Sequence, residues 1–333
     1  MPGTRFAAPR YRAMIDEMNH YGKNNIPFLF IIDFDMLQPV ILPLDRVDPR
    51  KIRYDIDGKR NYGHAAGPGM ETPVRLIRHP LPYEEYKEKF DLVVGHQMEG
   101  DSYLLNLTYP TKIEINISLE EIFLRSTARY KLLYDDEFVV FSPESFVKIR
   151  GTEISSYPMK GTIDAAVPDA VNAILNDEKE FAEHLTIVDL IRNDLNMVST
   201  KVTVERFRYV EKIRTIEKDL YQVSSKITGV LPGGYNARIG DILAAMLPAG
   251  SVTGAPKKKT VEIIKDAERY SRGYYTGIFG YFDGSSLDSA VMIRFIERCV
   301  DGTYYKSGGG ITVYSDPRLE YQELIDKVYV PIV

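Results

Sequence analysis

The sequence predicts an α+β protein with a large, mostly antiparallel β-sandwich core flanked by helices. Expected strands outnumber expected helices, and they come in runs rather than in strict strand–helix alternation. The 333 residues are 44% hydrophobic and 27% charged, the balance of a globular protein that buries a large core. Because no linker rich in Pro, Gly or Ser divides the chain, we predict a single domain over residues 1–333.

Strands are expected wherever apolar residues alternate or form short runs. Residues 26–34 form the strongest apolar run, and Ile113, Ile115 and Ile117 alternate with polar residues. Strands are predicted over residues 28–34, 40–44, 103–107, 112–117, 130–133, 138–141 and 146–149, within 201–230, and near 277–282, 290–300 and 311–313.

Helices are expected where apolar residues recur at helical spacing. Apolar side chains at 181, 185, 188, 191, 195 and 198 form such a stripe, and Pro256 suits the first turn of the helix that follows it. Helices are predicted over residues 83–100, 166–198, 243–247, 257–272 and 317–330, with a loop over 57–73. The segment 186–192 is apolar almost all round, so its helix is expected to be largely buried.

Charge and composition exclude several classes of function. The net charge is −5 and no long basic run occurs, which argues against a nucleic-acid partner. No targeting segment is visible and the longest apolar run is too short to span a bilayer, so we expect a cytoplasmic protein with no membrane partner. The single cysteine, Cys299, lies in an apolar stretch and is predicted to fill space in the core. One cysteine and five histidines are few ligands for zinc, so we expect no zinc site.

Two helices carry paired carboxylates. Glu180 and Glu183 share one helix face, and Glu320 and Glu323 share another with Lys327 one turn further. Each pair alone is typical of a solvated helix face. Two such pairs in one chain favour a site in which facing carboxylates bind a hard divalent cation, and Mg²⁺ accepts oxygen ligands without histidine or cysteine.

Three further segments could contact an anion or a reacting carbon. The loop from Gly250 to Gly254 precedes a helix and could present backbone N–H groups; the alternative is a plain turn. The glycines at 308–310 allow close approach of a ligand, or form a tight bend. Lys160 precedes Gly161-Thr162 and is either an ordinary surface lysine or a nucleophile whose pKa is lowered in a desolvated pocket.

Taken together and in this order, these segments resemble the chorismate-utilising enzymes. EHLTIVDLIRNDL is similar to the family's ENLMIVDLxRND block, and GSVTGAPKKKTVEII to its GGSITGAPK block. GIFGYFDG, the run from Asp288 to Arg294, GGGI and EYQELIDK complete the series. The resemblance covers residues 100–330 as the family core and leaves residues 1–90 as a shortened N-terminal part.

The residue before Gly161-Thr162 separates branches of this family. Lysine, as in Lys160 here, is typical of the aminodeoxychorismate synthases, whereas alanine is typical of anthranilate synthases. Isochorismate and salicylate synthases use water activated by a lysine on the strand that corresponds to residues 103–108, and this stretch has none. The alternatives left open are anthranilate synthase component I, an isochorismate or salicylate synthase, and a non-catalytic homologue.

The resemblance implies Mg²⁺-dependent amination of chorismate at C4 to 4-amino-4-deoxychorismate, on the p-aminobenzoate and folate route. It implies that Glu183 and Glu323 hold Mg²⁺ with support from Glu180 and Glu320. Lys160 would attack ring carbon 2 as the C4 hydroxyl leaves, with Glu144 as the acid, before ammonia adds at C4. The residues implied in substrate binding are Gly250, Ser251, Thr253, Tyr275, Arg294, Gly309, Gly310 and Lys327.

The sequence departs from the family pattern at Tyr221, where the family often has a histidine three residues before a serine, here Ser224. The source of ammonia is a second open point. No glutaminase signature is visible, since Cys299 lacks a glycine-rich nucleophile turn. We therefore expect a separate glutamine amidotransferase subunit as partner.

Overall fold

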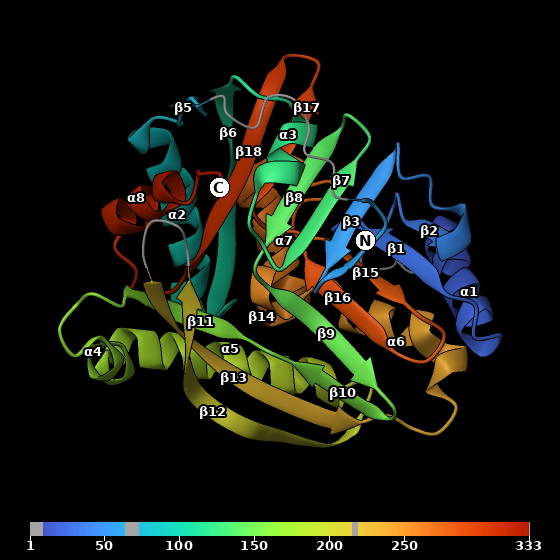
Figure 1. The fold of residues 1–333 in the computed structure, drawn as a ribbon. Coiled ribbons are helices and arrows are strands. Elements are labelled where there is room, and N and C mark those ends of the chain that lie inside the picture. The colour runs from blue at the N-terminus through green and yellow to red at the C-terminus, as the bar shows by residue number, and fades with distance from the viewer. Residues whose placement is uncertain (1–8, 64–72, 215–218, 333) are drawn as a thin grey trace.

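The computed structural model describes residues 9–63, 73–214 and 219–332 (Figure 1). Within these residues, the strands form two nine-stranded sheets, and their pairings are antiparallel. Helices flank the sheets on their outer faces. The predicted α+β class with a mostly antiparallel core is therefore confirmed.

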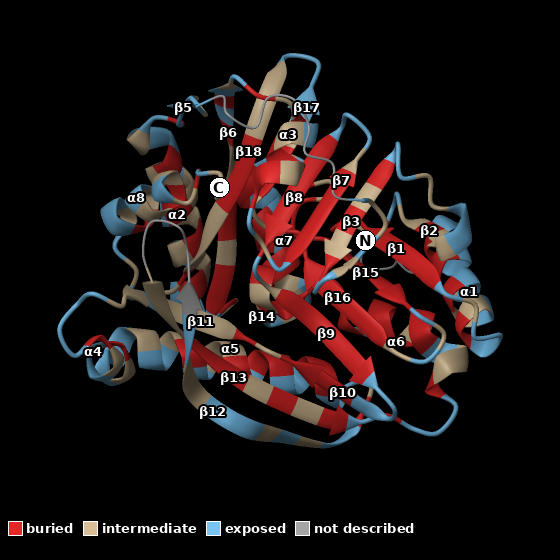
Figure 2. Cartoon of the chain, in the orientation of Figure 1, coloured by how far each residue is buried: buried red, intermediate tan, exposed pale blue. Residues whose placement is uncertain are grey.

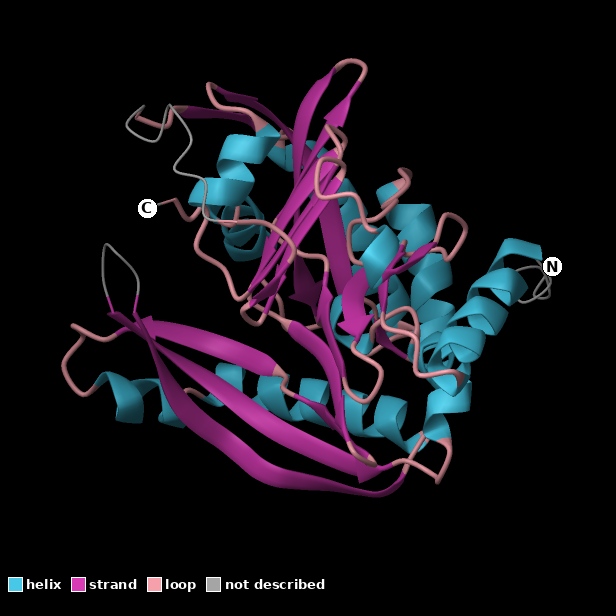
Figure 3. Ribbon diagram, turned by 45° about the vertical axis from the view of Figure 1, so that its right-hand side comes forward, coloured by secondary structure: helices cyan, strands magenta, loops and turns pink. Residues whose placement is uncertain are grey.

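The first sheet has the order β11-β13-β10-β9-β16-β15-β1-β2, and β12 pairs with β13 outside this path. Its strands are β1 (Phe28–Ile32), β2 (Val40–Pro43), β9 (Ser145–Arg150), β10 (Glu153–Ser156), β11 (Met159–Asp164), β12 (Thr200–Arg214), β13 (Asp219–Val230), β15 (Ile278–Phe282) and β16 (Leu287–Val291). The long β12–β13 hairpin curves beneath the rest of the molecule (Figure 3).

The second sheet has the order β14-β6-β18-β17-β8-β7-β3-β4, and β5 pairs with β6. Its strands are β3 (Ile52–Ile56), β4 (Lys59–Arg60), β5 (Leu76–His79), β6 (Leu104–Ile115), β7 (Tyr130–Tyr134), β8 (Phe138–Ser142), β14 (Gly254–Ala255), β17 (Phe295–Cys299) and β18 (Gly302–Ile311).

The helices cover the outer faces of these sheets. The α-helices are α1 (Pro9–Lys23), α2 (Tyr83–Met98), α3 (Leu119–Arg125), α4 (Ala170–Asn176), α5 (Glu178–Asn196), α6 (Ile239–Met246), α7 (Lys257–Glu268) and α8 (Pro317–Asp326). Single 3₁₀ turns are η1 (Leu44–Arg46), η2 (Tyr235–Arg238) and η3 (Gly250–Val252). In the described part of the chain, no helix combines the length and apolar character needed to cross a bilayer.

The strand β1 explains why residues 28–32 form an unbroken apolar run. Leu29 and Ile31 join the core between the two sheets, whereas Phe28, Phe30 and Ile32 join the core beneath the helices α1, α5 and α6. Because successive side chains point to opposite faces, a strand covered on both sides must be apolar at every position. Figure 2 shows this strand in red, buried along its length, on the right-hand side of the view.

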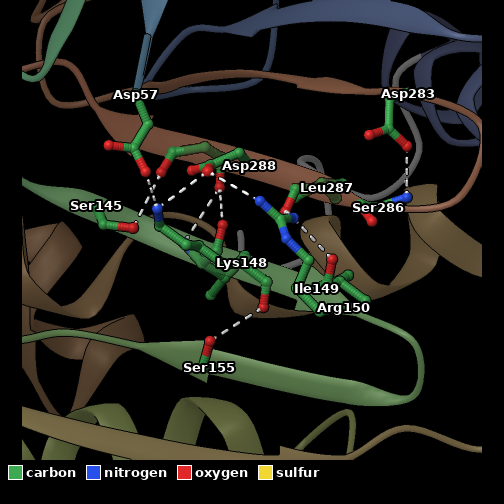
Figure 4. Close-up of polar contacts among 12 residues, drawn as sticks. Asp57, Ser145, Lys148, Ile149, Arg150, Ser155, Asp283, Ser286, Leu287 and Asp288 are labelled. Carbon is green, nitrogen blue, oxygen red and sulfur yellow. Dashed lines mark hydrogen bonds and ion pairs between the residues drawn. The ribbon is translucent and has the colours of Figure 1, made fainter. Parts of the chain in front are cut away.

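A partly buried ion cluster joins the two sheets beside this core (Figure 4). The Nζ atom of Lys148, on β9, lies 2.5 Å from Asp57 Oδ2 and 3.0 Å from Asp288 Oδ2. Asp57 follows β3 of the second sheet, and Asp288 lies on β16 of the first. Arg129 adds a contact of 2.8 Å to Asp57. Ion pairs therefore connect the two sheets at this edge of the core.

The structure corrects several sequence-based expectations about elements. The helices α1 and α3 were not predicted, and the expected helix over 166–198 is divided at Asp177 into α4 and α5. The two strands expected within 103–117 form one strand, β6, whereas the strand expected over 290–300 is interrupted between β16 and β17. The loop expected over 57–73 contains β4, and its residues 64–72 lie outside the described residues.

Two further predictions, that Cys299 fills the core and that helix α5 is largely buried, are wrong. Cys299 ends β17 and is exposed, so it is not core filler. The helix α5 is not buried all round, because Phe181 and Leu185 are exposed on its outer face. Of the predicted apolar stripe, Val188, Ile191 and Leu195 pack on the core, whereas its first two members, Phe181 and Leu185, do not.

Candidate active site

A bulge in β11 positions Lys160. The pairing of β11 with β13 shifts register between Met159 and Thr162, and Gly161 adopts a φ of +88° that favours glycine. The bulge turns the Lys160 side chain toward α5, where its Nζ atom lies 2.5 Å from Glu183 Oε2. Burial alone would lower the pKa of this amine, but the Glu183 carboxylate outweighs burial and raises the pKa. The lowered pKa expected for a nucleophilic lysine is thus absent in this ion pair.

The two carboxylates of α5 face β11. Asp177 caps the helix by accepting a hydrogen bond from the Glu180 N–H group at 2.9 Å. Glu180 then points at the bulge, since a Cβ atom added at Gly161 would lie 3.0 Å from Glu180 Oε2. This oxygen is buried and has no hydrogen-bond partner, and burial raises the pKa of Glu180. An unpaired buried carboxylate oxygen is costly, which points to a missing ligand.

The helix α8 brings the second carboxylate pair. Asp316 caps α8 by accepting from the N–H groups of Arg318 and Leu319. Glu323 lies 2.6 Å from Lys327 Nζ, and Lys327 also donates to the Gly308 carbonyl at 2.8 Å. Burial raises the pKa of Glu320, whereas the attraction of Lys327 outweighs burial at Glu323 and lowers its pKa.

A lysine that the sequence did not single out bridges the two helices. The ammonium group of Lys179 lies 3.7 Å from Glu183 Oε1 and 3.8 Å from Glu320 Oε1. A cation is therefore already held between the carboxylates of α5 and α8. Together with the unpartnered oxygen of Glu180, this ammonium shows that the space between the two helices accommodates positive charge. The four glutamates offer the oxygen ligands that a hard divalent cation prefers, but the structure does not bring three of them within 4.8 Å of one another.

Two adjoining cavities connect these helices with the glycine-rich strand. The first, about 120 Å³, is lined by Leu104, Asn106, Lys160, Glu183, Ile187, Gly250, Ser251, Thr253, Gly254, Gly309, Gly310 and Lys327. The second, about 150 Å³, shares Asn106, Ser251 and Lys327 with it and adds Glu144, Tyr275, Arg294 and other residues. The structure thus brings the sequence-predicted residues to one place, with Glu180, Glu320 and Glu323 directly beside the cavities.

Glu144 is the buried acid of the second cavity. It lies between β8 and β9 and accepts a hydrogen bond of 2.5 Å from the Ser251 hydroxyl. Burial raises the pKa of Glu144, which favours its protonated form. Such a carboxyl group can donate a proton to a departing oxygen.

Arg294 and Tyr275 lie across the same cavity. Arg294 donates to the Lys327 carbonyl at 2.7 Å, and its guanidinium group lies over the ring of Tyr329. Tyr275 is buried. Arg294 therefore fixes the backbone from which the Lys327 side chain extends, while its charge faces the cavity.

For the glycine segments, the structure bears on the alternatives that the sequence left open. Gly308, Gly309 and Gly310 lie inside β18 and pair with β6, so they form neither a bend nor a bulge. A Cβ atom at Gly309 would lie 3.3 Å from Glu320 Oε2, which shows how closely the strand approaches α8. In the other loop, the Gly250 N–H group donates to Asp194 and the Thr253 N–H group to the Gly250 carbonyl. These two N–H groups are therefore bonded within the protein.

Asn106 and Tyr221 add two points that sequence reasoning did not resolve. Asn106 lines both cavities, and its buried Oδ1 atom has no hydrogen-bond partner. Its signal was a single amide within the short apolar run from Leu104 to Leu107. Tyr221 lies on β13 opposite Ile163 of β11 and lines neither cavity.

The fold and this cavity define a class of α+β proteins that bind a small polar ligand between an acidic helix pair and a glycine-rich strand. A family model described as chorismate binding enzyme matches residues 56–332. The chain belongs to this family.

The chain is similar to two curated proteins and to one solved structure in particular. An uncharacterized PabA-like protein of Haemophilus influenzae is 52% identical over 96% of this chain and 96% of its own length. Aminodeoxychorismate synthase component 1 of Salmonella typhimurium is 30% identical over 83% of this chain, which spans only 63% of that protein. Among solved structures, anthranilate synthase component I from Streptococcus pneumoniae aligns with a TM-score of 0.65 and 29% identity, covering 77% of this chain and 59% of that one.

Proposed function

We propose that the chain aminates chorismate at C4 and forms 4-amino-4-deoxychorismate, which leads to the p-aminobenzoate part of folate. The observation that carries this proposal is the amine of Lys160, which lines the same cavity as Glu183 and Lys327. The likeness to aminodeoxychorismate synthase component 1 supports the same branch of the family. In this proposal the chain acts inside the cell, where chorismate is made.

Lys160 acts as the nucleophile in the first half of the reaction. Its amine forms a bond to ring carbon 2, both double bonds of the ring diene shift by one position, and the bond between C4 and oxygen breaks. Glu144 gives its proton to the departing hydroxide, so water leaves. Arg294 and Tyr275 bind the enolpyruvyl carboxylate, and the backbone of Gly309 and Gly310 lies against it.

Ammonia completes the second half. It forms a bond to C4 while the bond between C2 and the Lys160 nitrogen breaks, and its surplus proton returns to Glu144. The sum is chorismate plus ammonia giving aminodeoxychorismate plus water. Lys327, Gly250, Ser251 and Thr253 keep the ring in place during both halves.

The glutamates are proposed to hold Mg²⁺, with Glu183 and Glu323 as ligands and Glu180 and Glu320 behind them. When bound, Mg²⁺ supplies positive charge that holds the ring carboxylate and takes over the charge of Glu183 from Lys160. A cation held by Glu183 would neutralise this carboxylate, so Glu183 would no longer stabilise the ammonium form of Lys160 and would leave the amine available as a nucleophile.

A glutamine amidotransferase subunit is proposed as the source of ammonia. Burial and the neighbouring Glu297 raise the pKa of the Cys299 thiol, which opposes the thiolate needed to hydrolyse glutamine. We expect the purified chain to use ammonium with chorismate and Mg²⁺, and to use glutamine only after the amidotransferase is added. Glutamine-dependent turnover by the chain alone would exclude the partner.

Anthranilate synthesis is the second candidate, because a solved anthranilate synthase component is 29% identical. That reaction eliminates pyruvate, whereas amination at C4 retains the enolpyruvyl group. A coupled lactate dehydrogenase assay during turnover with ammonium separates the two. Stoichiometric pyruvate would overturn the proposed function in favour of the second candidate.

A further inference from the structure

Asn106 is an amide of the active site to which the proposed reaction gives no role. It lies on β6 and lines both cavities. Its Oδ1 atom is buried and has no hydrogen-bond partner. A buried acceptor without a donor is costly, and beside a reactive lysine such an oxygen points to a donor that arrives with the reactants.

The backbone of Asn106 is fixed on both sides. Its N–H group donates to the Thr253 carbonyl at 2.8 Å. Its carbonyl accepts from Arg272 Nη2 at 2.7 Å, and Arg272 is itself buried in an ion pair with Glu268 at 2.6 Å. Across the sheet Asn106 faces Gly310, which has no side chain to fill the space beside the amide. The amide is therefore carried by a rigid frame, and the protein does not use its oxygen.

Asn106 also lies at the junction of the two cavities. In the described part of the chain, three residues line both: Asn106, Ser251 and Lys327. The polar groups of the other two side chains already have partners. The Ser251 hydroxyl donates to Glu144 at 2.5 Å, and the Lys327 ammonium lies 2.6 Å from Glu323. Of these three residues, Asn106 is therefore the one that offers a free acceptor.

In the proposed reaction this junction is where C4 of the ring lies. Lys160, which attacks C2, lines the first cavity, and Glu144, the acid for the C4 oxygen, lines the second. Only one ring carbon separates C2 from C4, so a ring that meets both groups has C4 between them. The departing water and the incoming ammonia both occupy that place. Ammonia has hydrogens to donate while its lone pair forms the bond to C4.

A neutral amide suits an ammonia nucleophile better than a carboxylate does. A carboxylate at this position would stabilise ammonium, whose nitrogen has no lone pair, and the ammonium form of Lys160. The amide oxygen of Asn106 accepts a hydrogen bond from ammonia and leaves it neutral. Positive charge develops on the nitrogen as the new bond forms, and the negative end of the amide dipole lies beside it. The hydrogen bond therefore strengthens toward the transition state.

We propose that Asn106 binds the ammonia nucleophile and directs its lone pair at C4. This inference rests on the proposed amination of chorismate and adds a residue to it. In this step the lone pair of ammonia forms the bond to C4, the bond between C2 and the Lys160 nitrogen breaks, and one proton of ammonia passes to Glu144. Asn106 accepts a hydrogen bond and exchanges no proton.

The test compares the ammonium dependence of turnover with the binding of chorismate. Asn106→Leu removes the acceptor, and Asn106→Asp keeps the shape but adds a charge. The control is Asn236→Leu, because Asn236 Oδ1 is likewise buried without a partner but lies on η2, outside both cavities.

We expect Asn106→Leu to raise the ammonium concentration for half-maximal rate by about tenfold or more. Chorismate binding, measured by calorimetry, should stay within about threefold, because the ring is held by other residues. Asn106→Asp should lower kcat as well, since the added charge holds both amines in their protonated forms. Asn236→Leu should change neither the ammonium dependence nor the binding of chorismate.

Exchange of oxygen-18 from water into the C4 hydroxyl of chorismate separates this role from a structural one. In the proposed reaction water returns to C4 when ammonia is absent, and ammonium should suppress this return in the unaltered chain. Asn106→Leu should keep the exchange while it loses amination, so exchange should continue at ammonium concentrations that suppress it in the unaltered chain. A distorted cavity would lower exchange and amination together.

An unchanged ammonium dependence in Asn106→Leu would overturn the proposal. Equal loss of exchange and amination, or loss of chorismate binding, would also overturn it, since Asn106 would then shape the cavity as a whole. If the unaltered chain aminates without exchange, the ammonium dependence of Asn106→Leu decides alone. If the unaltered chain does not aminate chorismate at all, the proposed function fails instead, so the two failures are distinguishable.

Discussion

The ammonium group of Lys160 lies 2.5 Å from the carboxylate of Glu183, at the point where a bulged strand meets an acidic helix. The contact joins β11 to α5, and Lys179 continues it to Glu320 on α8. Charge compensation in the cavity is therefore provided by lysines and glutamates that alternate on α5 and α8, together with Lys160 on β11. A divalent cation would redistribute this compensation.

Replacement of Lys160 by alanine should lower amination by about 10³-fold or more, because the covalent step loses its nucleophile. Lys179→Ala is the matched control, since Lys179 also lies near Glu183, at 3.7 Å, but is proposed to take no part in bond formation. We expect this control to stay within about tenfold of the unaltered rate. Steady-state rates with ammonium measure both, and an unimpaired Lys160→Ala variant would remove the covalent role.

Neutralising a proposed metal ligand should raise the Mg²⁺ concentration needed for half-maximal rate. Glu183→Gln and Glu323→Gln are each expected to weaken Mg²⁺ binding by about tenfold or more. Calorimetric titration with Mg²⁺ measures the binding without catalysis. Glu120→Gln, on α3 beside Arg53, serves as the control. Equal Mg²⁺ affinity in all of these proteins would contradict the assigned ligands.

The pH dependence of turnover should report Glu144. Burial raises the pKa of this acid, and the proposed step needs its protonated form, so the rate should fall as the pH rises through that raised value. Glu144→Gln should lower kcat by about 10²-fold and remove this limb of the profile. If Glu144→Gln is slow but its rate still falls over the same pH range, a group other than Glu144 causes that pH dependence.

The cluster between the sheets should govern part of the stability at low pH. Arg129 and Lys148 lower the pKa of Asp57 to about 2, so the stabilisation is present above the ordinary Asp pKa and is lost as the pH falls through about 2. Asp57→Asn should cost about 1 kcal/mol at neutral pH after allowance for its partial exposure, and about half of that near pH 3.

Chemical unfolding of Asp57→Asn and of the unaltered protein at the two pH values measures this difference. Asp48→Asn is the control: Asp48 pairs with Arg50 only two residues away, and such a local contact persists in part in the unfolded chain. A cost of Asp57→Asn that does not change with pH would show that the lost contact is not ionic.

Periodicity predicted elements that bury a regular face, and it failed where a short element depends on its cap. The strand β1 was predicted because both of its faces are buried, whereas the seven-residue helix α3 was missed. The signal for α3 was present in the capping box formed by Ser118 and Glu121. Cys299 was misassigned because the apolar residues before it continue only to Ile296 in the core.

The candidate site could be assembled from sequence only as a set of residues. The spacing of Glu180, Glu183, Glu320 and Glu323 indicated two acidic helix faces, and the family pattern indicated that they meet. The contact of Lys160 with Glu183, and the bridge by Lys179, depend on a bulge and on how two distant helices pack. Such relationships are tertiary, so no local pattern contains them.

The central claim is that this chain aminates chorismate at C4. Liquid chromatography with mass spectrometry of the product formed from chorismate, ammonium and Mg²⁺ tests it most directly. The account predicts 4-amino-4-deoxychorismate, with the enolpyruvyl group intact and one hydroxyl replaced by an amino group. Anthranilate, isochorismate or unchanged chorismate as the sole outcome would contradict it.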